Sequence, residues 1–208
     1  MQLLHLFLLA ATTASSVLSK ETVEDAALLA RGLVSNPLAI GVMATIFPEN
    51  SDLRGEPFAL QEYYASCYTN GSLSLITMPI SRHTRNIVNS PTHSASMTVW
   101  TSPPAASRAR VSLIGNVTFL SSRFAEESGI KDCYLAAHRD ARWWLPDDPD
   151  AAHTAYWARF DPYSIFFVGG FGDKHYIGDI PTELYQRVGP TYTEEALQTE
   201  DNVLQVQE

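Results

Sequence analysis

The clearest alternation of apolar and polar residues runs from Arg108 to Leu120. Every second residue from Ala109 to Phe119 is apolar or glycine, and most of the residues between them are polar. Successive side chains of a strand point to opposite faces of its sheet, so this pattern predicts a strand with one buried and one solvated face.

Two apolar runs near the C-terminal end, Thr154–Phe160 and Tyr163–Val168, show no such alternation. They are rich in aromatic and β-branched residues, which predicts strands buried on both faces, in the middle of a sheet or in a barrel wall. Asp161-Pro162 predicts a break between them, because proline lacks the N–H that a central strand donates. Gly169–Gly172 then predicts a tight turn.

The remaining strands are predicted at Ile40–Phe47, Phe58–Tyr68, Leu73–Met78 and His93–Thr101. The second and third are expected to form a hairpin, because Asn-Gly at residues 70–71 is a strong turn signal.

Apolar residues at a spacing of three and four predict an amphipathic helix over Ser19–Val34, capped by Ser19 or Thr22. Further helical segments are expected at Ser81–Asn89, Phe124–His138 and Pro181–Tyr185. Many consecutive strands with few helices predict an α+β fold whose antiparallel sheet closes into a barrel.

The composition fits one domain. The chain has 208 residues, 45% of them hydrophobic, which is enough for one sizeable core. Its net charge of −9 argues against a nucleic-acid binder, which would present a basic surface. No window supplies the roughly 20 apolar residues of a transmembrane helix, so no membrane span is expected.

The two ends differ from the middle. Residues 1–19 combine an apolar stretch, Leu3–Ala11, with small residues up to Ser19, which predicts a secretory signal peptide. Residues 20–189 form the expected domain. The acidic residues 190–208 offer little to bury, and we expect a disordered tail there.

Two further features agree with secretion. Asn70-Gly71-Ser72 and Asn116-Val117-Thr118 are N-glycosylation sequons. Cys67 and Cys133 form an even pair, and they are either joined in a disulfide or left as two buried thiols. The sequence alone leaves both alternatives open.

Local motifs for catalysis are scarce. The histidines and cysteines lack the spacing of a metal site, and no serine or cysteine stands in a nucleophile motif. One segment could bind an anion: Ser81, Arg82, His83 and Arg85 open a predicted helix directly after a strand. Free N–H groups, a hydroxyl and two guanidiniums can together hold a phosphate, whereas the simpler interpretation is a capped helix with solvated arginines.

Several segments together resemble the CREG family of the FMN-binding split-barrel superfamily, which also contains the pyridoxamine 5'-phosphate oxidases. The resemblance covers about residues 26–185. The segments that carry it are ALLARGLV followed by IGVMATI, RGEPFA at 54–59, MPISRHTRNIVNSP at 78–91, RVSLIGNVTFL, HRDARWW at 138–144, and FFVGGFG.

This resemblance implies a split β-barrel with a few peripheral helices, a homodimer formed through the sheet, N-glycosylation, and secretion or delivery to the endolysosomal lumen. It also implies a flavin pocket that is obstructed. FMN is a possible cofactor, with its phosphate at Ser81, Arg82, His83 and Arg85. His83 stands where the oxidases carry lysine, and the only charge of the strand that supplies their basic residues is Glu62, which would oppose a phosphate.

Two functions follow as hypotheses. The first is a secreted, glycosylated, non-catalytic binding module whose protein or small-molecule partner is unknown. The alternative is an FMN-dependent oxidoreductase acting on a small molecule, with aromatic residues such as Trp157 lining its site. The superfamily also contains haem-degrading proteins with a similar glycine-rich strand end, so His175 is either a haem ligand or an exposed loop histidine.

Overall fold

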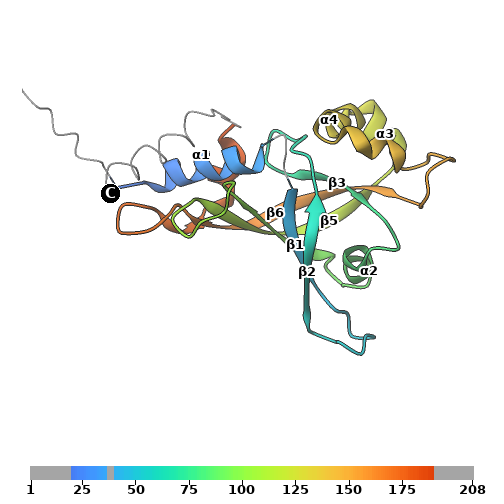
Figure 1. The fold of residues 1–208 in the computed structure, drawn as a ribbon, viewed down its shortest axis with the longest axis horizontal. Helices are drawn as coiled ribbons and strands as arrows, with labels where there is room; N and C mark the ends of the chain where they lie inside the picture. The colour runs from blue at the N-terminus through green and yellow to red at the C-terminus, as the bar shows by residue number, and fades with distance from the viewer. Residues whose placement is uncertain (1–19, 37–39, 190–208) are drawn as a thin grey trace, which may run out of the picture.

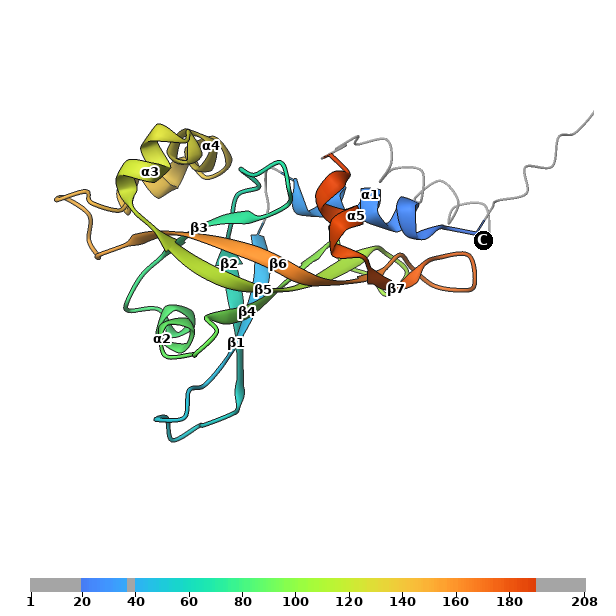
Figure 2. The same cartoon turned by 180° about the vertical axis from the view of Figure 1, so that it is seen from behind.

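The computed structural model describes residues 20–36 and 40–189, and within them the strands form one antiparallel sheet. The strands are β1 Ile40–Ile46, β2 Pro57–Tyr63, β3 Leu73–Thr77, β4 Ser94–Trp100, β5 Arg110–Leu120, β6 Tyr156–Val168 and β7 Ile177–Ile180. Their order is β2-β1-β4-β5-β6-β3, and β7 pairs with β6 (Figure 1 and Figure 2). The expected α+β fold with an antiparallel sheet is confirmed. The predicted signal peptide and acidic tail lie outside the described residues.

The helices lie around this sheet. They are α1 Val23–Val34, α2 Arg82–Val88, α3 Ser122–Glu127, α4 Ile130–Ala137, the 3-10 helix η1 Arg139–Trp143, and α5 Thr182–Arg187. Helices α1 and α5 pack together at one end of the long strands, while α3 and α4 pack at the other end (Figure 2). Helix α2 contacts β1. In this part of the chain, no helix has the length and apolarity that crossing a bilayer requires.

Helix α1 begins as its sequence predicts. Thr22 is the N-cap: its Oγ1 accepts a hydrogen bond from Asp25 N at 3.2 Å, and Asp25 Oδ2 accepts one from Thr22 N at 2.9 Å. This reciprocal pair satisfies N–H groups that have no partner within the first turn. The helix then buries a face of apolar residues against the sheet and α5, and its Arg31 is buried as well.

The predicted break at Asp161-Pro162 is wrong, because β6 is one continuous strand. Its register against β5 shifts by one residue, so that Ile114 pairs with Ser164 while Gly115 pairs with Pro162. On the other side, β3 pairs only up to Phe160 and β7 only from Ile165. Pro162 therefore sits at a bulge and has a paired strand on one side only. The sheet loses no backbone hydrogen bond through its missing N–H.

The predicted hairpin of Phe58–Tyr68 with Leu73–Met78 is also wrong. Strand β2 ends at Tyr63 and pairs with β1, whereas β3 pairs with β6. A single bridge, Ala65 to Ser74, joins the two segments. Strand β3 is buried along its whole length, and it pairs with the long, largely apolar β6.

The predicted helix over Phe124–His138 is divided in two. Gly129 has φ +74° and acts as the N-cap of α4, after α3 has ended at Glu127. Glycine adopts this left-handed conformation without the clash that a Cβ would cause, so the chain changes direction there.

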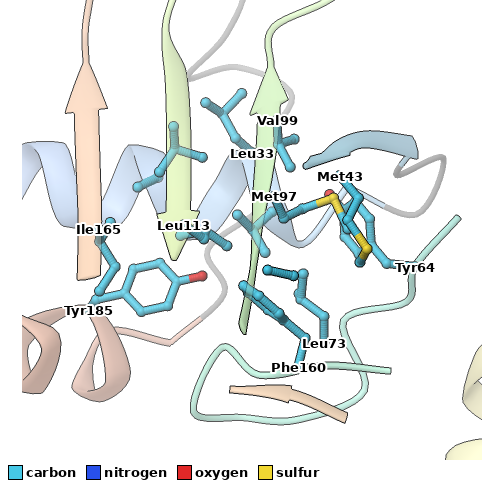
Figure 3. Packing of buried hydrophobic residues seen from close by; sticks show 14 of the residues in the cluster. Leu33, Met43, Tyr64, Leu73, Met97, Val99, Leu113, Phe160, Ile165 and Tyr185 are labelled. Carbon is cyan, nitrogen blue, oxygen red and sulfur yellow. The ribbon is translucent and has the colours of Figure 1, made fainter. Parts of the chain in front are cut away.

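The buried side chains form two clusters. The larger lies between α1, α5 and the sheet, and Figure 3 shows Leu33 of α1 close to Val99, Met97 and Leu113 of the central strands. The smaller lies under α3 and α4, and includes Ala125, Tyr134 and Trp157. The pocket described below borders this smaller cluster.

Candidate functional site

The turn between β3 and α2 presents the residues that were predicted to bind phosphate. Ser81 is the N-cap of α2, and its backbone N–H donates to Met78 O at 2.8 Å. Its side chain makes no capping hydrogen bond. The helix that follows has only seven residues, so its dipole is short.

The two arginines of this segment have partners within the protein. The Arg82 guanidinium carbon lies 5.2 Å from the centre of the Phe47 ring, and Arg85 Nη2 donates to Ile80 O at 2.9 Å. Both arginines line a depression of about 420 Å³ beside the β1–β2 loop, and Asp52 of that loop lies in its wall. Each guanidinium is therefore already engaged within the protein.

His83 points into the protein instead of toward a ligand. It is only 3% exposed, and its Nδ1 lies 3.2 Å from Thr45 Oγ1, which also accepts a hydrogen bond from Asn86 Nδ2. Burial lowers the pKa of His83, because desolvation disfavours the imidazolium. A buried, neutral imidazole cannot replace the lysine that the oxidases place beside the phosphate.

Ser81 and Thr84 line a different pocket, of about 230 Å³, which we call the Glu62 pocket. It lies between the end of β2, the end of β3, α2 and α4. Its lining residues are Glu62, Tyr63, Ile76, Thr77, Met78, Ile80, Ser81, Thr84, Tyr134 and Trp144. Three aromatic side chains and three hydroxyl side chains thus surround one carboxyl group.

The Glu62 carboxyl group is in an unusual state. Burial raises its pKa from 4.5 to about 7, against a smaller opposing effect of the hydrogen bond that Tyr63 N donates to Oε1 at 3.3 Å. Burial and the Glu62 carboxylate both raise the pKa of Tyr134. None of the residues lining the pocket carries a positive charge.

Two other expectations about site residues are corrected. Trp157 is 2% exposed and packs edge-on against Tyr134, with 5.6 Å between ring centres, so it belongs to the core and lines no open site. His175 is neither fully exposed nor free: its Nδ1 lies 3.7 Å from Glu21 Oε2. In residues 20–36 and 40–189, no three His, Cys, Asp or Glu side chains gather as metal ligands.

The two sequons occupy different surroundings. Asn70 is exposed at its turn, and its Oδ1 accepts a hydrogen bond from Ser72 N. Asn116 is half-buried on β5, and its Nδ2 donates to Thr92 O. Of the two states that the sequence left open for the cysteines, the structure has the disulfide between Cys67 and Cys133, with 5.9 Å between the Cα atoms.

Sequence reasoning identified Glu62 and Ser81 but missed the wall of the pocket around them. Tyr134 and Trp144 lie 72 and 82 residues further along the chain than Glu62, and nothing local connects them to it. The one available signal was Glu62 itself, a lone charge in an apolar strand.

Comparison with known proteins gives one family. The CREG, beta-barrel family profile matches residues 21–187. No curated protein matches the chain.

Several solved structures share the fold. A heme binding protein from Mycobacterium smegmatis is 24% identical, with a TM-score of 0.60 over 77% of this chain and 60% of that one. A protein of unknown function from Agrobacterium tumefaciens is 17% identical, with a TM-score of 0.57 over 73% and 60%. A pyridoxamine 5'-phosphate oxidase-related, FMN binding protein from Nostoc punctiforme is 17% identical, with a TM-score of 0.48 over 72% and 84%. This chain thus spans three fifths of the first two proteins.

Proposed function

The chain belongs to the CREG β-barrel family, and from this premise we propose that it is a secreted, N-glycosylated binding module without catalytic activity. One observation carries the proposal. The four side chains that would hold a flavin phosphate do not converge: Ser81 lines the Glu62 pocket, Arg82 and Arg85 line the depression beside the β1–β2 loop, and His83 is buried.

The residues present therefore do not fit FMN. A phosphate placed at Ser81 would share its pocket with the Glu62 carboxyl group, which would oppose its binding. The Glu62 pocket, at about 230 Å³, is also smaller than the roughly 300–1,000 Å³ of pockets that enclose drug-sized ligands. We derive no flavin chemistry for this chain.

Secretion and glycosylation have separate support. Residues 1–19 have the composition of a signal peptide, and Asn70 is exposed at the tip of a turn. A disulfide is typical of oxidising compartments. We place the protein outside the cell or in the endolysosomal lumen.

A homodimer is supported by an apolar surface beside α2. An open depression of about 470 Å³ is lined by Pro79, Val88, Phe119 and Tyr156 among others, and Val88 is 53% exposed. Contiguous exposed apolar surface of this kind marks sites of protein association. The same surface would serve a different protein partner.

The decisive experiment is a titration of the purified, secreted protein with FMN, following flavin fluorescence, after recording its visible spectrum. We expect a colourless protein and no saturable quenching. Quenching that saturates at one FMN per subunit, and that Arg82→Ala abolishes, would replace the proposal with the FMN-dependent oxidoreductase. Haemin should be titrated in parallel, because a similar mycobacterial protein is described as heme binding; haemin binding that His175→Ala abolishes would assign a cofactor to this chain.

Secretion and dimerisation are tested on the same material. We expect the protein expressed from the full-length chain to be found in the culture medium. Enzymatic deglycosylation should shift its electrophoretic mobility, and this shift should be smaller in Asn70→Gln. Light scattering after size exclusion should give twice the subunit mass. Retention in the cell without glycan would contradict secretion, and a monomer would contradict the dimer.

A further inference from the structure

The Glu62 pocket combines a carboxyl group with aromatic walls and lacks a positive charge of its own. Tyr63, Tyr134 and Trp144 supply the rings, and Ser81 with Thr84 supplies hydroxyl groups. Aromatic faces and a carboxylate both attract cations, and together they form the usual recognition site for substituted ammonium ions. An anion would be repelled by the same carboxylate.

We propose that the Glu62 pocket binds a small organic ammonium ion, with the Glu62 carboxylate as its counter-ion and the rings of Tyr63, Tyr134 and Trp144 around its alkyl groups. This inference rests on the proposed function as a binding module and names the chemistry of a ligand. The pocket's size, about 230 Å³, selects a compact cation over an extended molecule.

The partners of Glu62 within the protein support this assignment. Among the described residues, the Glu62 carboxyl group accepts one hydrogen bond, from the backbone N–H of Tyr63 at 3.3 Å, which leaves most of the acceptor capacity of the carboxylate unused. Glu62 is half-buried, and a carboxylate that is withdrawn from water normally has a cation or several donors beside it. A bound ammonium ion would supply that missing charge.

The pocket walls are held in place by contacts behind them. Tyr134 packs edge-on against the buried Trp157, and its ring also contacts His138, whose Nε2 lies 2.6 Å from Tyr64 O. The disulfide anchors Cys133, the residue before Tyr134. A wall fixed in this way loses little entropy when a ligand binds.

Protonation of Glu62 would compete with the cation. The titratable groups around it are the phenols of Tyr63 and Tyr134, then His138, whose ring contacts both, and Asp140, which acts on Tyr134. The guanidinium of Arg85 lies beside the pocket, where its Nη2 donates at 2.9 Å to the carbonyl oxygen of the lining residue Ile80. Because burial raises the Glu62 pKa to about 7, the carboxylate fraction falls steeply below neutrality. Affinity should be about 100-fold lower at pH 5 than at pH 8.

The test uses calorimetric titration of the purified, full-length secreted protein with choline and tetramethylammonium at pH 8. The matched control ligand is 3,3-dimethylbutan-1-ol, the uncharged carbon isostere of choline. We expect saturable binding of the two cations and at least tenfold weaker binding of the alcohol. No saturation by either cation at about 10 mM, well above the millimolar constant expected for so small a ligand, would overturn the proposal.

Variants localise the binding. Glu62→Gln should lower choline affinity at least tenfold and abolish its pH dependence, whereas Glu56→Gln, an exposed carboxylate six residues earlier, should change neither. Trp144→Leu should lower the affinity for both cations without changing the pH dependence of that affinity. Unchanged affinity in both Glu62→Gln and Trp144→Leu would place any binding elsewhere.

A second arm separates the sources of the ammonium group. Sedimentation with phosphatidylcholine vesicles that Glu62→Gln abolishes would assign it to a lipid headgroup, and choline binding without sedimentation would assign it to a free ligand. Failure of both arms removes this inference and leaves the proposed function intact, because that function is tested separately by cofactor titration, secretion and oligomeric state.

Discussion

Arg31 Nη2 donates a hydrogen bond of 2.7 Å to the carbonyl oxygen of Thr69, from a side chain that is completely buried. The guanidinium carbon also lies 5.1 Å from the centre of the Tyr185 ring. Among the described residues, no carboxylate pairs with this arginine. A cation from α1 thus fastens the loop that carries the Asn70 sequon, and α5 packs over it.

This arrangement predicts different costs for two substitutions of Arg31. Arg31→Ala should lower the free energy of unfolding by about 3 kcal/mol, because it opens a cavity and removes the bond to Thr69. Arg31→Met should cost at most about 1 kcal/mol, because it fills the space and ends the desolvation of a charge, while water can reach the exposed Thr69. Urea unfolding measures both. If Arg31→Met and Arg31→Ala lower the free energy of unfolding equally, the charge and not the packing stabilises the loop.

Gly169 and Glu21 are predicted to be energetically coupled. A Cβ on Gly169 would lie 2.2 Å from Glu21 Oε2, which accepts a hydrogen bond of 2.6 Å from Tyr176 N. Gly169→Ala should therefore displace the carboxylate and cost about 2 kcal/mol, the contribution of a charged hydrogen bond. In a Glu21→Ala background the same substitution should cost less than about 1 kcal/mol. Additive losses in the double variant would contradict the coupling.

The Cys67–Cys133 disulfide should be a major stabilising element. It joins residues 66 positions apart, and on the chain-entropy model a loop of that length contributes about 4 kcal/mol. We expect the Cys67→Ala/Cys133→Ala double variant to lose that amount in urea unfolding. A variant within about 1 kcal/mol of the wild type would show that the unfolded chain is constrained without the bridge.

Glu62 should make the protein less stable as pH rises. Its pKa is about 7 in the folded state against 4.5 in the unfolded state, so between these values the folded state holds the extra proton. Stability is then complete below about pH 4.5 and falls by up to about 3 kcal/mol as pH rises through 7. Glu62→Gln should be more stable than the wild type at pH 8 and similar at pH 4.5. If the urea midpoints of the two proteins differ by the same amount at every pH in this range, the pKa of Glu62 is not raised by folding.

Much of the fold was readable from the sequence, because the relevant signals are local. The alternation from Arg108 to Leu120 reports which face of β5 is buried, and Thr22 with Asp25 marks the start of α1 through contacts three residues apart. The family resemblance, carried by short segments in a fixed order, is confirmed by the profile match.

The predictions that proved wrong concern which strands pair with one another. The Asn-Gly signal at residues 70–71 predicted a hairpin, yet β3 pairs with β6, about 80 residues away. Local turn chemistry competes there with burial, and burial prevails because β3 has no solvated face. In the same way Pro162 remains inside a strand, since the neighbours of β6 leave one side free at that point.

The sequence by itself determined the fold class, the family, and the residue types available for a site. Only the tertiary structure decided that Ser81, Arg82, His83 and Arg85 separate into two pockets and the core, and that Tyr134 and Trp144 come to surround Glu62. The physical reason is the distance along the chain over which each kind of interaction acts. Helix and strand patterns depend on residues two to four positions apart, whereas the desolvation of a carboxylate depends on side chains that only the folded chain brings together.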